Sequence, residues 1–322
     1  MLSKKLLRGT FVVVLCGLLG GCYSHAKDQP SVQASLPVYP LDQSIENIVY
    51  TASYWPQPLQ ADLHLPRKAG LHPVVLMVHG GGWAGRGRDD MDDVSRKLVS
   101  HGYAVFNVSY RFAPRFKYPA QLQDLQQALV WITENARRYN LDIDRINAWG
   151  YSSGAHLAAL IGSMNANHSR AVNLPELPRI NAVVAGGIPS DLRKFNDSPI
   201  VMRFLGGELE EMPERYAEAS PVYHVSSDDP PVFLYHGKLD FLVTDDHASD
   251  YHQALVAAGV ESELYLHNWR GHMTMFLFGD DAENRAIDFL HRYGAQTKPV
   301  VTIPAGKAQG LASFFPGRPD QY

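Results

Sequence analysis

Short, unbroken apolar runs alternate with stretches of helical periodicity through most of this chain, and that alternation limits the folds it can adopt. A strand with one solvent-exposed face alternates apolar and polar residues, whereas a strand buried on both faces is apolar throughout. The second pattern predicts strands at 73–78, 103–108, 145–149, 182–185, 232–235 and 263–267.

The stretches between these runs carry apolar residues at helical spacing. They predict helices at 91–100, 119–139, 153–164, 245–258 and 281–293. Strands that alternate with helices form a mostly parallel sheet covered on both faces, so we expect an α/β fold in one domain at 47–295. Two alternating stretches, 47–53 and 59–65, predict an antiparallel edge on the N-terminal side. Residues 189–230 break the alternation and predict an insertion, and 296–322 predict a loose tail.

The N-terminus is a separate unit. Three basic residues precede an apolar stretch at 10–19, which has the length of a signal peptide and is short for a membrane span. Small residues then lead to Cys22, which resembles a bacterial lipoprotein signal. We therefore expect a signal peptide at 1–21, an acylated Cys22 and a tether at 22–46 that holds the domain on the cell envelope, at the outer membrane. The alternative is cleavage after Ala26, which gives a soluble periplasmic or secreted protein.

Composition and residue spacing also bear on disulfides, nucleic-acid partners and metal sites. Of the two cysteines, Cys16 leaves with the signal peptide and Cys22 is acylated, so no disulfide is expected in the mature fold. The net charge is −4 and no basic block lies beyond the N-terminus, so nothing points to a nucleic-acid partner. Histidines do not occur at metal-binding spacing such as His-Glu-x-x-His, so neither a metal nor a cofactor is implied.

Two glycine-rich motifs directly follow predicted strands. The first is GYSSG at 150–154, which lies between a strand and a helix and so can hold Ser152 at the carboxyl edge of a sheet, above a helix N-terminus. The second is HGGGW at 79–83, whose glycines let backbone amides approach a developing oxyanion. No Gly-Lys-Ser/Thr follows it, as a phosphate loop would need. The two motifs together predict a nucleophilic serine.

A serine needs a base to become a nucleophile, and the base needs a carboxylate to orient it. Asp240 follows the predicted strand at 232–235, and His272 follows the one at 263–267. Both are therefore expected at the carboxyl edge, in the chain order serine, acid, histidine.

Other candidates fit these roles less well. Asp245 and Asp246 suit the start of a helix, where carboxylates cap amides and favour the dipole. His236 and His267 suit packing or hydrogen bonding, and His156 suits the buried face of a helix.

These motifs, with YRFAPRFKYPAQLQD at 110–124 and HGKLD at 236–240, resemble the α/β-hydrolase esterases of the hormone-sensitive-lipase-like type. They are similar to the bacterial carboxylesterase branch that includes feruloyl and acetyl-xylan esterase-like proteins. The resemblance covers about residues 55–293. It implies an α/β-hydrolase fold. The site residues that it implies are a triad of Ser152, His272 and Asp240 and an oxyanion hole from the amides of Gly81, Gly82 and Ser153.

The matched stretches also contain Arg111 and Asp124, which we expect to form an ion pair that fixes a strand–helix connection. Tyr151 stands where the family commonly has aspartate, which implies a different pocket floor. The expected pocket walls are Trp83, Phe112, Tyr151 and Met275.

The resemblance implies a serine carboxylesterase that hydrolyses small to medium acyl esters through an acyl-enzyme intermediate, with the membrane reached through Cys22. Alternatives are an amidase similar to arylformamidases, a lysophospholipase or lipase, and a catalytically inactive binding lipoprotein. The last is disfavoured because every triad member and both oxyanion elements are present.

Overall fold

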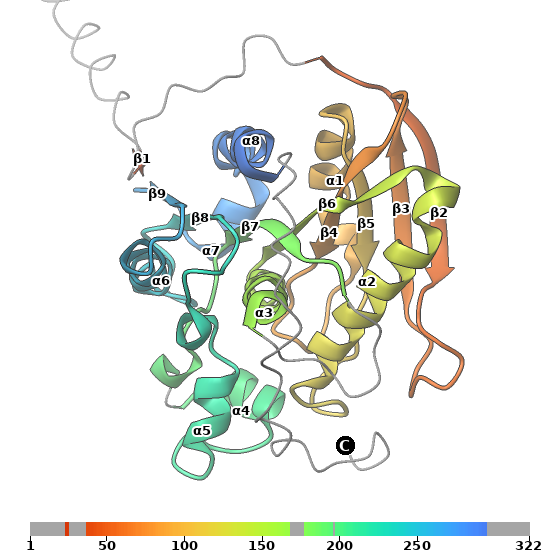
Figure 1. Cartoon of the computed structure of the whole chain (residues 1–322). Coiled ribbons are helices and arrows are strands. Elements are labelled where there is room, and N and C mark those ends of the chain that lie inside the picture. The colour runs from red at the N-terminus through yellow and green to blue at the C-terminus, as the bar shows by residue number, and fades with distance from the viewer. Residues whose placement is uncertain (1–22, 26–36, 168–176, 196, 295–322) are drawn as a thin grey trace, which may run out of the picture.

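The computed structural model describes residues 23–25, 37–167, 177–195 and 197–294. Within them, one nine-stranded sheet has the strand order β1-β9-β8-β7-β6-β4-β5-β3-β2 (Figure 1). The strands are β1 (Tyr23–His25), β2 (Leu41–Val49), β3 (Gln60–Pro66), β4 (His72–Val78), β5 (Ala104–Val108), β6 (Leu141–Tyr151), β7 (Ile180–Gly186), β8 (Val232–Gly237) and β9 (Ser262–His267).

Pairing in this sheet matches the mostly parallel arrangement expected from the sequence. In the order of the sheet, β5, β4, β6, β7 and β8 each run parallel to the next strand, up to β9. Antiparallel pairs lie at the edges, where β3 joins β5, β2 joins β3 and β1 joins β9. The predicted α/β-hydrolase fold, with its antiparallel N-terminal edge, is confirmed.

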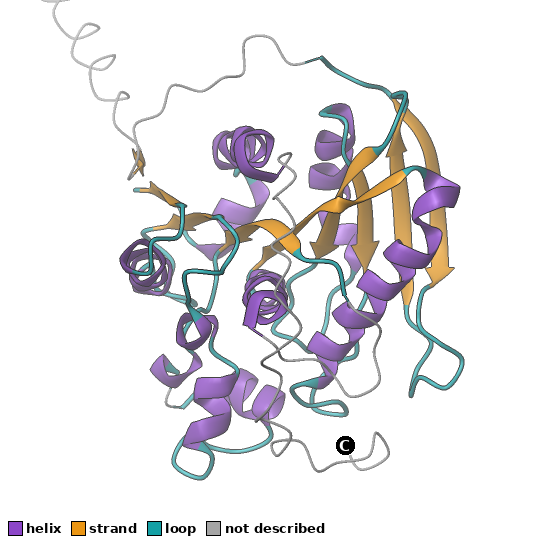
Figure 2. Ribbon diagram, in the orientation of Figure 1, coloured by secondary structure: helices purple, strands orange, loops and turns teal. Residues whose placement is uncertain are grey.

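Helices cover both faces of the sheet (Figure 2). Their bounds are α1 (Asp92–Ser100), α2 (Ala120–Tyr139), α3 (Ser153–Asn167), α4 (Pro199–Leu205), α5 (Pro213–Glu218), α6 (Asp246–Ala257), α7 (His272–Leu277) and α8 (Asp280–Phe289). Apolar side chains of α1 and α8 belong to one core cluster, and those of α2, α3 and α6 to the other.

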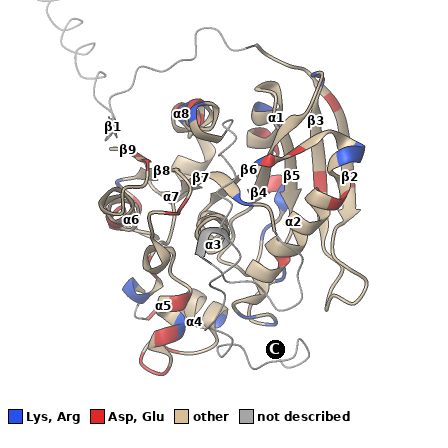
Figure 3. Cartoon of the chain, viewed as in Figure 1, with Lys and Arg blue, Asp and Glu red and all other residues tan. Residues whose placement is uncertain are grey.

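The two clusters explain why the central strands lack polar alternation. In β4, Val74, Leu76 and Val78 face the α2, α3 and α6 side, and Val75 and Met77 face the α1 and α8 side. A strand enclosed in this way buries both of its faces, and so apolar residues occupy most of its positions. β4, β5, β7 and β8 contain no Lys, Arg, Asp or Glu, and their ribbons are tan in Figure 3.

The N-terminal edge differs from its prediction. The strand expected at 47–53 is β2, which begins at Leu41, inside the segment expected to be a tether, and ends at Val49. β1 also lies in that segment. Most of β2 is exposed and its register shifts near Asn47, so the strand has little apolar patterning to reveal it. Edge strands are held mainly by backbone hydrogen bonds, which leave a weak trace in the sequence.

Arg111 and Asp124 form the expected ion pair between the end of β5 and α2. The guanidinium Nε donates to the carboxylate at 2.7 Å, and the Arg111 amide donates to its other oxygen at 2.8 Å. The Trp55 indole adds a third hydrogen bond, at 2.7 Å. Because both charged groups are buried and joined by these hydrogen bonds, the pair fixes how α2 leaves the sheet.

The segment at 189–230 forms short helices, among them α4 and α5, below the carboxyl edge of the sheet in Figure 1. The predicted signal peptide, Cys22 and the tail at 296–322 lie outside the described residues. Among the helices that are described, none has both the length and the apolar character needed to span a membrane.

Candidate active site

Ser152 occupies a sharp turn between β6 and α3. Its φ is +56°, a left-handed conformation that costs energy for any residue with a Cβ. The Ser152 amide donates to the carbonyl of Gly186, at the end of β7, at 2.7 Å. This bond ties the turn to the neighbouring strand, so the side chain is held at the carboxyl edge of the sheet.

The two motif glycines are required by close backbone approach. A Cβ on Gly150 would lie 2.2 Å from the carbonyl oxygen of Gly154, and a Cβ on Gly154 would lie 2.1 Å from that of Val78. Both distances are shorter than any real contact. The Gly-x-Ser-x-Gly spacing is therefore a packing requirement of the turn against β4.

The structure brings Ser152, His272 and Asp240 together, although 120 residues separate the serine from the histidine. His272 Nε2 lies 2.9 Å from Ser152 Oγ, and His272 Nδ1 lies 2.6 Å from Asp240 Oδ2. His272 begins α7, and Asp240 lies in the loop after β8. Since the carboxylate accepts from Nδ1–H, the other ring nitrogen is free to accept the serine proton.

Asp240 is held as a carboxylate by its surroundings. Its burial favours the neutral acid, but hydrogen bonds from His236, His272 and the Val243 amide outweigh that effect and lower its pKa well below the usual range. Oδ1 accepts from the amides of Leu242 and Val243 at 3.0 and 2.9 Å. The negative charge that orients His272 is thus kept at all ordinary pH values.

The expected oxyanion residues face the same space. Gly81, Gly82, Ser152 and Ser153 line one cavity together with His272. Within the described part of the chain, the amides of Gly81, Gly82 and Ser153 donate to no protein acceptor. Three unpaired donors beside a serine hydroxyl can stabilise negative charge on a bound oxygen.

Trp83 holds the HGGGW loop in place. Its ring stacks on Phe204 of α4 with centroids 4.2 Å apart, and its indole N–H donates to His156 Nδ1 at 3.2 Å. The ring of His79, at the other end of the motif, stacks on Tyr110 with centroids 4.4 Å apart. Ring packing therefore fixes the position of the loop at both of its ends.

The cavity has a volume of about 480 Å³. Its walls are mainly apolar and include Phe195, Ile200, Val201, Leu242 and Phe276, and Arg86 and Asp90 form an ion pair at 3.3 Å on its border. Of the expected pocket walls, Trp83 and Tyr151 line the cavity, whereas Phe112 and Met275 do not.

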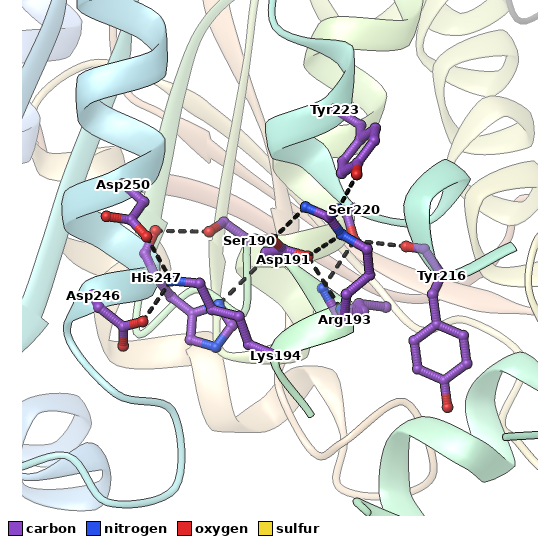
Figure 4. Close-up of polar contacts among 11 residues, drawn as sticks. Ser190, Asp191, Arg193, Lys194, Tyr216, Ser220, Tyr223, Asp246, His247 and Asp250 are labelled. Carbon is purple, nitrogen blue, oxygen red and sulfur yellow. Dashed lines mark hydrogen bonds and ion pairs between the residues drawn. The ribbon is translucent and has the colours of Figure 1, made fainter. Parts of the chain in front are cut away.

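The wall that contains Phe195 is attached to α6 by a polar network (Figure 4). Lys194 Nζ lies 2.5 Å from Asp246 and 2.7 Å from Asp250, and Arg193 pairs with Asp191 at 2.7 Å. The Phe195 ring stacks on His247 of α6, with centroids 4.8 Å apart. These contacts fix one side of the cavity to the body of the fold.

The competing residues have the structural roles expected of them. His156 is buried, and its Nε2 donates to the Ala219 carbonyl at 2.6 Å. His267 ends β9, where its Nδ1 accepts from the Trp269 amide at 3.3 Å. Asp245 and Asp246 stand at the start of α6 as expected, but the Asp245 side chain caps no amide there, and Asp246 pairs with Lys194.

Sequence reasoning placed His236 among packing or hydrogen-bonding residues and missed that its partner is Asp240. His236 Nε2 lies 2.8 Å from the Val243 carbonyl and 3.3 Å from Asp240 Oδ2. The four-residue spacing of the two residues in HGKLD was the available signal. Tyr151 was also seen only as a pocket wall, yet its hydroxyl donates to the His272 carbonyl at 2.6 Å.

Groups of three or more His, Cys, Asp or Glu side chains that could hold a metal ion do not occur in the part of the chain that the structure describes.

A family model described as BD-FAE matches residues 61–255. Esterase LipQ of Mycobacterium tuberculosis is 32% identical over 224 residues, which cover 66% of this chain and 51% of LipQ. Carboxylesterase NlhH of the same species is 32% identical, covering 66% of each chain. This chain spans about half the length of several curated relatives that it matches.

A solved structure supports the fold independently. The chain resembles EstE1, described as a thermophilic carboxylesterase cloned from a metagenomic library, with a TM-score of 0.66 and 22% identity. The alignment covers 81% of this chain and 91% of that one.

Proposed function

The chain belongs to the BD-FAE family, and from that premise we propose that it is a serine carboxylesterase with Ser152 as its nucleophile. The observation that carries the proposal is the unbroken hydrogen-bonded line from Ser152 Oγ through His272 to Asp240. The esterase names of its relatives support the reaction class.

In the proposed acylation, Ser152 Oγ attacks the carbonyl carbon of the ester while His272 Nε2 takes the hydroxyl proton. The amides of Gly81, Gly82 and Ser153 hydrogen-bond to the resulting oxyanion. His272 then gives its proton to the leaving alcohol, and the C–O bond to that alcohol breaks. Acyl-Ser152 remains.

Deacylation reverses these roles. His272 removes a proton from water, which attacks the acyl carbon, and the proton returns to Ser152 as the acid leaves. Asp240 stays ionised throughout, because hydrogen bonds keep its pKa well below the usual range despite burial. It therefore stabilises the protonated His272 formed in each half-reaction.

The acyl group is proposed to be small or of medium length. A mainly apolar cavity of about 480 Å³ supports this range, since it is within the size typical of small-molecule sites. In the described part of the chain, the border of the cavity also includes residues of the segment at 189–230, among them Ile200 and Val201 of the short helix α4.

The test is hydrolysis of p-nitrophenyl esters from acetyl to palmitoyl, beside a feruloyl ester and N-formylkynurenine. We expect the highest kcat/KM on the shorter acyl esters. Ser152→Ala should reduce it on the order of a thousandfold or more while leaving the fold intact. If N-formylkynurenine were turned over faster than the short acyl esters, the protein would instead be an amidase. If palmitoyl esters were turned over faster than the short ones, it would be a lipase. Wild-type-like turnover by Ser152→Ala would overturn the proposal.

We also propose that Cys22 is acylated and anchors the protein to the outer membrane. The basic N-terminus, the apolar stretch at 10–19 and the small residues before Cys22 support this. Labelling with radioactive palmitate tests it: the wild type should incorporate label and Cys22→Ser should not. The proposal would be contradicted if both chains were labelled equally, or if the wild type incorporated no label.

A further inference from the structure

Large apolar side chains are exposed on two segments that follow strands, the loop after β8 and the segment that runs from the end of β9 through α7 to Phe278. Of the sixteen large apolar side chains exposed in the described residues, seven lie there. We call these seven the apolar rim: Leu239, Phe241, Leu242, Trp269, Met273, Leu277 and Phe278. Phe241 is 89% exposed and Trp269 is 71% exposed. Concentrated exposure of this kind marks interaction surfaces, whereas single exposed apolar residues need no explanation.

The two loops form one surface. The first follows β8 and contains Phe241 and Leu242, and the second follows β9 and leads into α7. The Leu239 amide donates to the Arg270 carbonyl at 3.0 Å, and the Lys238 amide donates to the His267 carbonyl at 2.9 Å. These backbone bonds join the loops side by side.

The apolar rim borders the mouth of the active-site cavity. Leu242 comes from the first loop and Met273 from the second, and both line that cavity beside His272. The two segments that carry Asp240 and His272 therefore also carry the exposed apolar side chains. Whatever covers the rim lies next to the entrance of the site.

The N-terminal strand leads the chain to this same edge. β1 runs antiparallel to β9, with Tyr23 opposite His267 and His25 opposite Tyr265 (Figure 1). His267 is two residues before Trp269. Cys22, the proposed attachment point, directly precedes Tyr23 in the sequence and lies outside the described residues.

The charges beside the rim also suit a lipid surface. Lys238 is exposed on the first loop, and Arg270 is partly exposed on the second, with its Nη1 buried. Basic residues next to exposed aromatic and aliphatic side chains favour anionic headgroups. Asp280 and Asp281 follow Phe278 and limit the surface on that side.

We infer that the apolar rim docks on a lipid bilayer, so that the cavity opens toward the membrane to which Cys22 is proposed to anchor the chain. Burial of the exposed side chains in the headgroup region supplies the favourable free energy. Docking through the rim is a property of the surface and does not depend on turnover at Ser152.

Flotation with vesicles of phosphatidylethanolamine and phosphatidylglycerol tests this inference. Every described helix and strand lies at or after Tyr23, so a chain of residues 23–322 keeps the whole described fold and excludes binding by an acyl group or by the leader. This chain should float with the vesicles. The double variant Phe241→Ser/Trp269→Ser should partition at least about tenfold less, because two large side chains no longer enter the interface.

Tyr54→Ser is the matched control. Tyr54 is 76% exposed and lies in the β2–β3 connection, at the opposite edge of the sheet from β9. It should float like the parent chain, and all three chains should hydrolyse p-nitrophenyl acetate alike. The inference would be overturned if the parent chain did not float with the vesicles. It would also be overturned if Tyr54→Ser lost as much vesicle binding as the double variant. A dimer that only the double variant dissociates would overturn it as well, since a second copy would then cover the rim.

Discussion

The hydroxyl of Tyr151 donates to the backbone carbonyl of His272 at 2.6 Å, and the two rings pack with centroids 5.2 Å apart. The residue before the proposed nucleophile thus holds the start of the helix that carries the proposed base. This bond links the end of β6 to the start of α7, and the relative position of these two elements sets the distance from Ser152 Oγ to His272 Nε2.

Tyr151→Phe should therefore lower kcat about tenfold with little change in KM, because a lost buried hydrogen bond loosens His272 without removing any group that the mechanism uses. Steady-state kinetics on p-nitrophenyl acetate measures both constants. Tyr103→Phe removes the hydroxyl of a tyrosine buried on the α1 and α8 side and should leave kcat unchanged. An unaltered kcat in Tyr151→Phe would show that this bond does not position the base.

Gly187→Ala should reduce kcat/KM on the order of a hundredfold. Gly187 has a φ of +57°, and a Cβ there would lie 3.0 Å from both His272 Cε1 and Tyr151 Cζ. The methyl group would press on the imidazole. Gly259→Ala is the control, since its φ of +79° carries a similar strain but its Cβ would meet no atom within 4 Å.

Both alanine variants should lose about 1 kcal/mol of stability from the left-handed backbone alone. Thermal unfolding measures that loss, and esterase activity separates the two variants. Equal activity in Gly187→Ala and Gly259→Ala would mean that the contact with His272 has no catalytic effect.

The stability of the fold should fall in acid partly through His156. Burial lowers the pKa of His156 to about 3, whereas its ordinary value is 6.5. Between these values the unfolded chain binds a proton that the folded chain does not, so the free energy of unfolding decreases as the pH falls. One such proton contributes a slope of about 1.4 kcal/mol per pH unit.

His156→Gln cannot titrate and loses this contribution. The stability difference between wild type and His156→Gln should therefore shrink by about 1 kcal/mol per pH unit between about pH 6 and pH 4. Urea unfolding of both chains at several pH values measures it. A difference that stays constant over this range would mean that His156 is protonated in the folded protein.

Much of the fold could be predicted because enclosed strands and amphipathic helices leave strong patterns. The run at 73–78 became β4, and the stretch at 119–139 became α2, each within one residue of its predicted bounds. β1 and β2 were missed or displaced, since edge pairing depends on backbone groups that all residues share. α7 was missed because a six-residue helix has too few turns to show a period.

The residues of the site also fall into those that the sequence could predict and those that it could not. Ser152, Asp240 and His272 could be proposed because each follows a recognisable strand, and the carboxyl ends of parallel strands meet at one edge. The contacts of Tyr151 and Gly187 with His272 could not, because they depend on how β6, β7 and α7 pack in three dimensions. No spacing along the chain encodes such a contact.

The central claim is that Ser152 is a nucleophile activated by His272. Reaction with a fluorophosphonate probe, followed by peptide mass spectrometry, tests it most directly, since only an activated serine is phosphonylated. We predict one adduct, on Ser152, that is lost in His272→Gln although that variant keeps the serine. An adduct on another serine, no adduct in the wild type, or undiminished labelling of His272→Gln would contradict the claim.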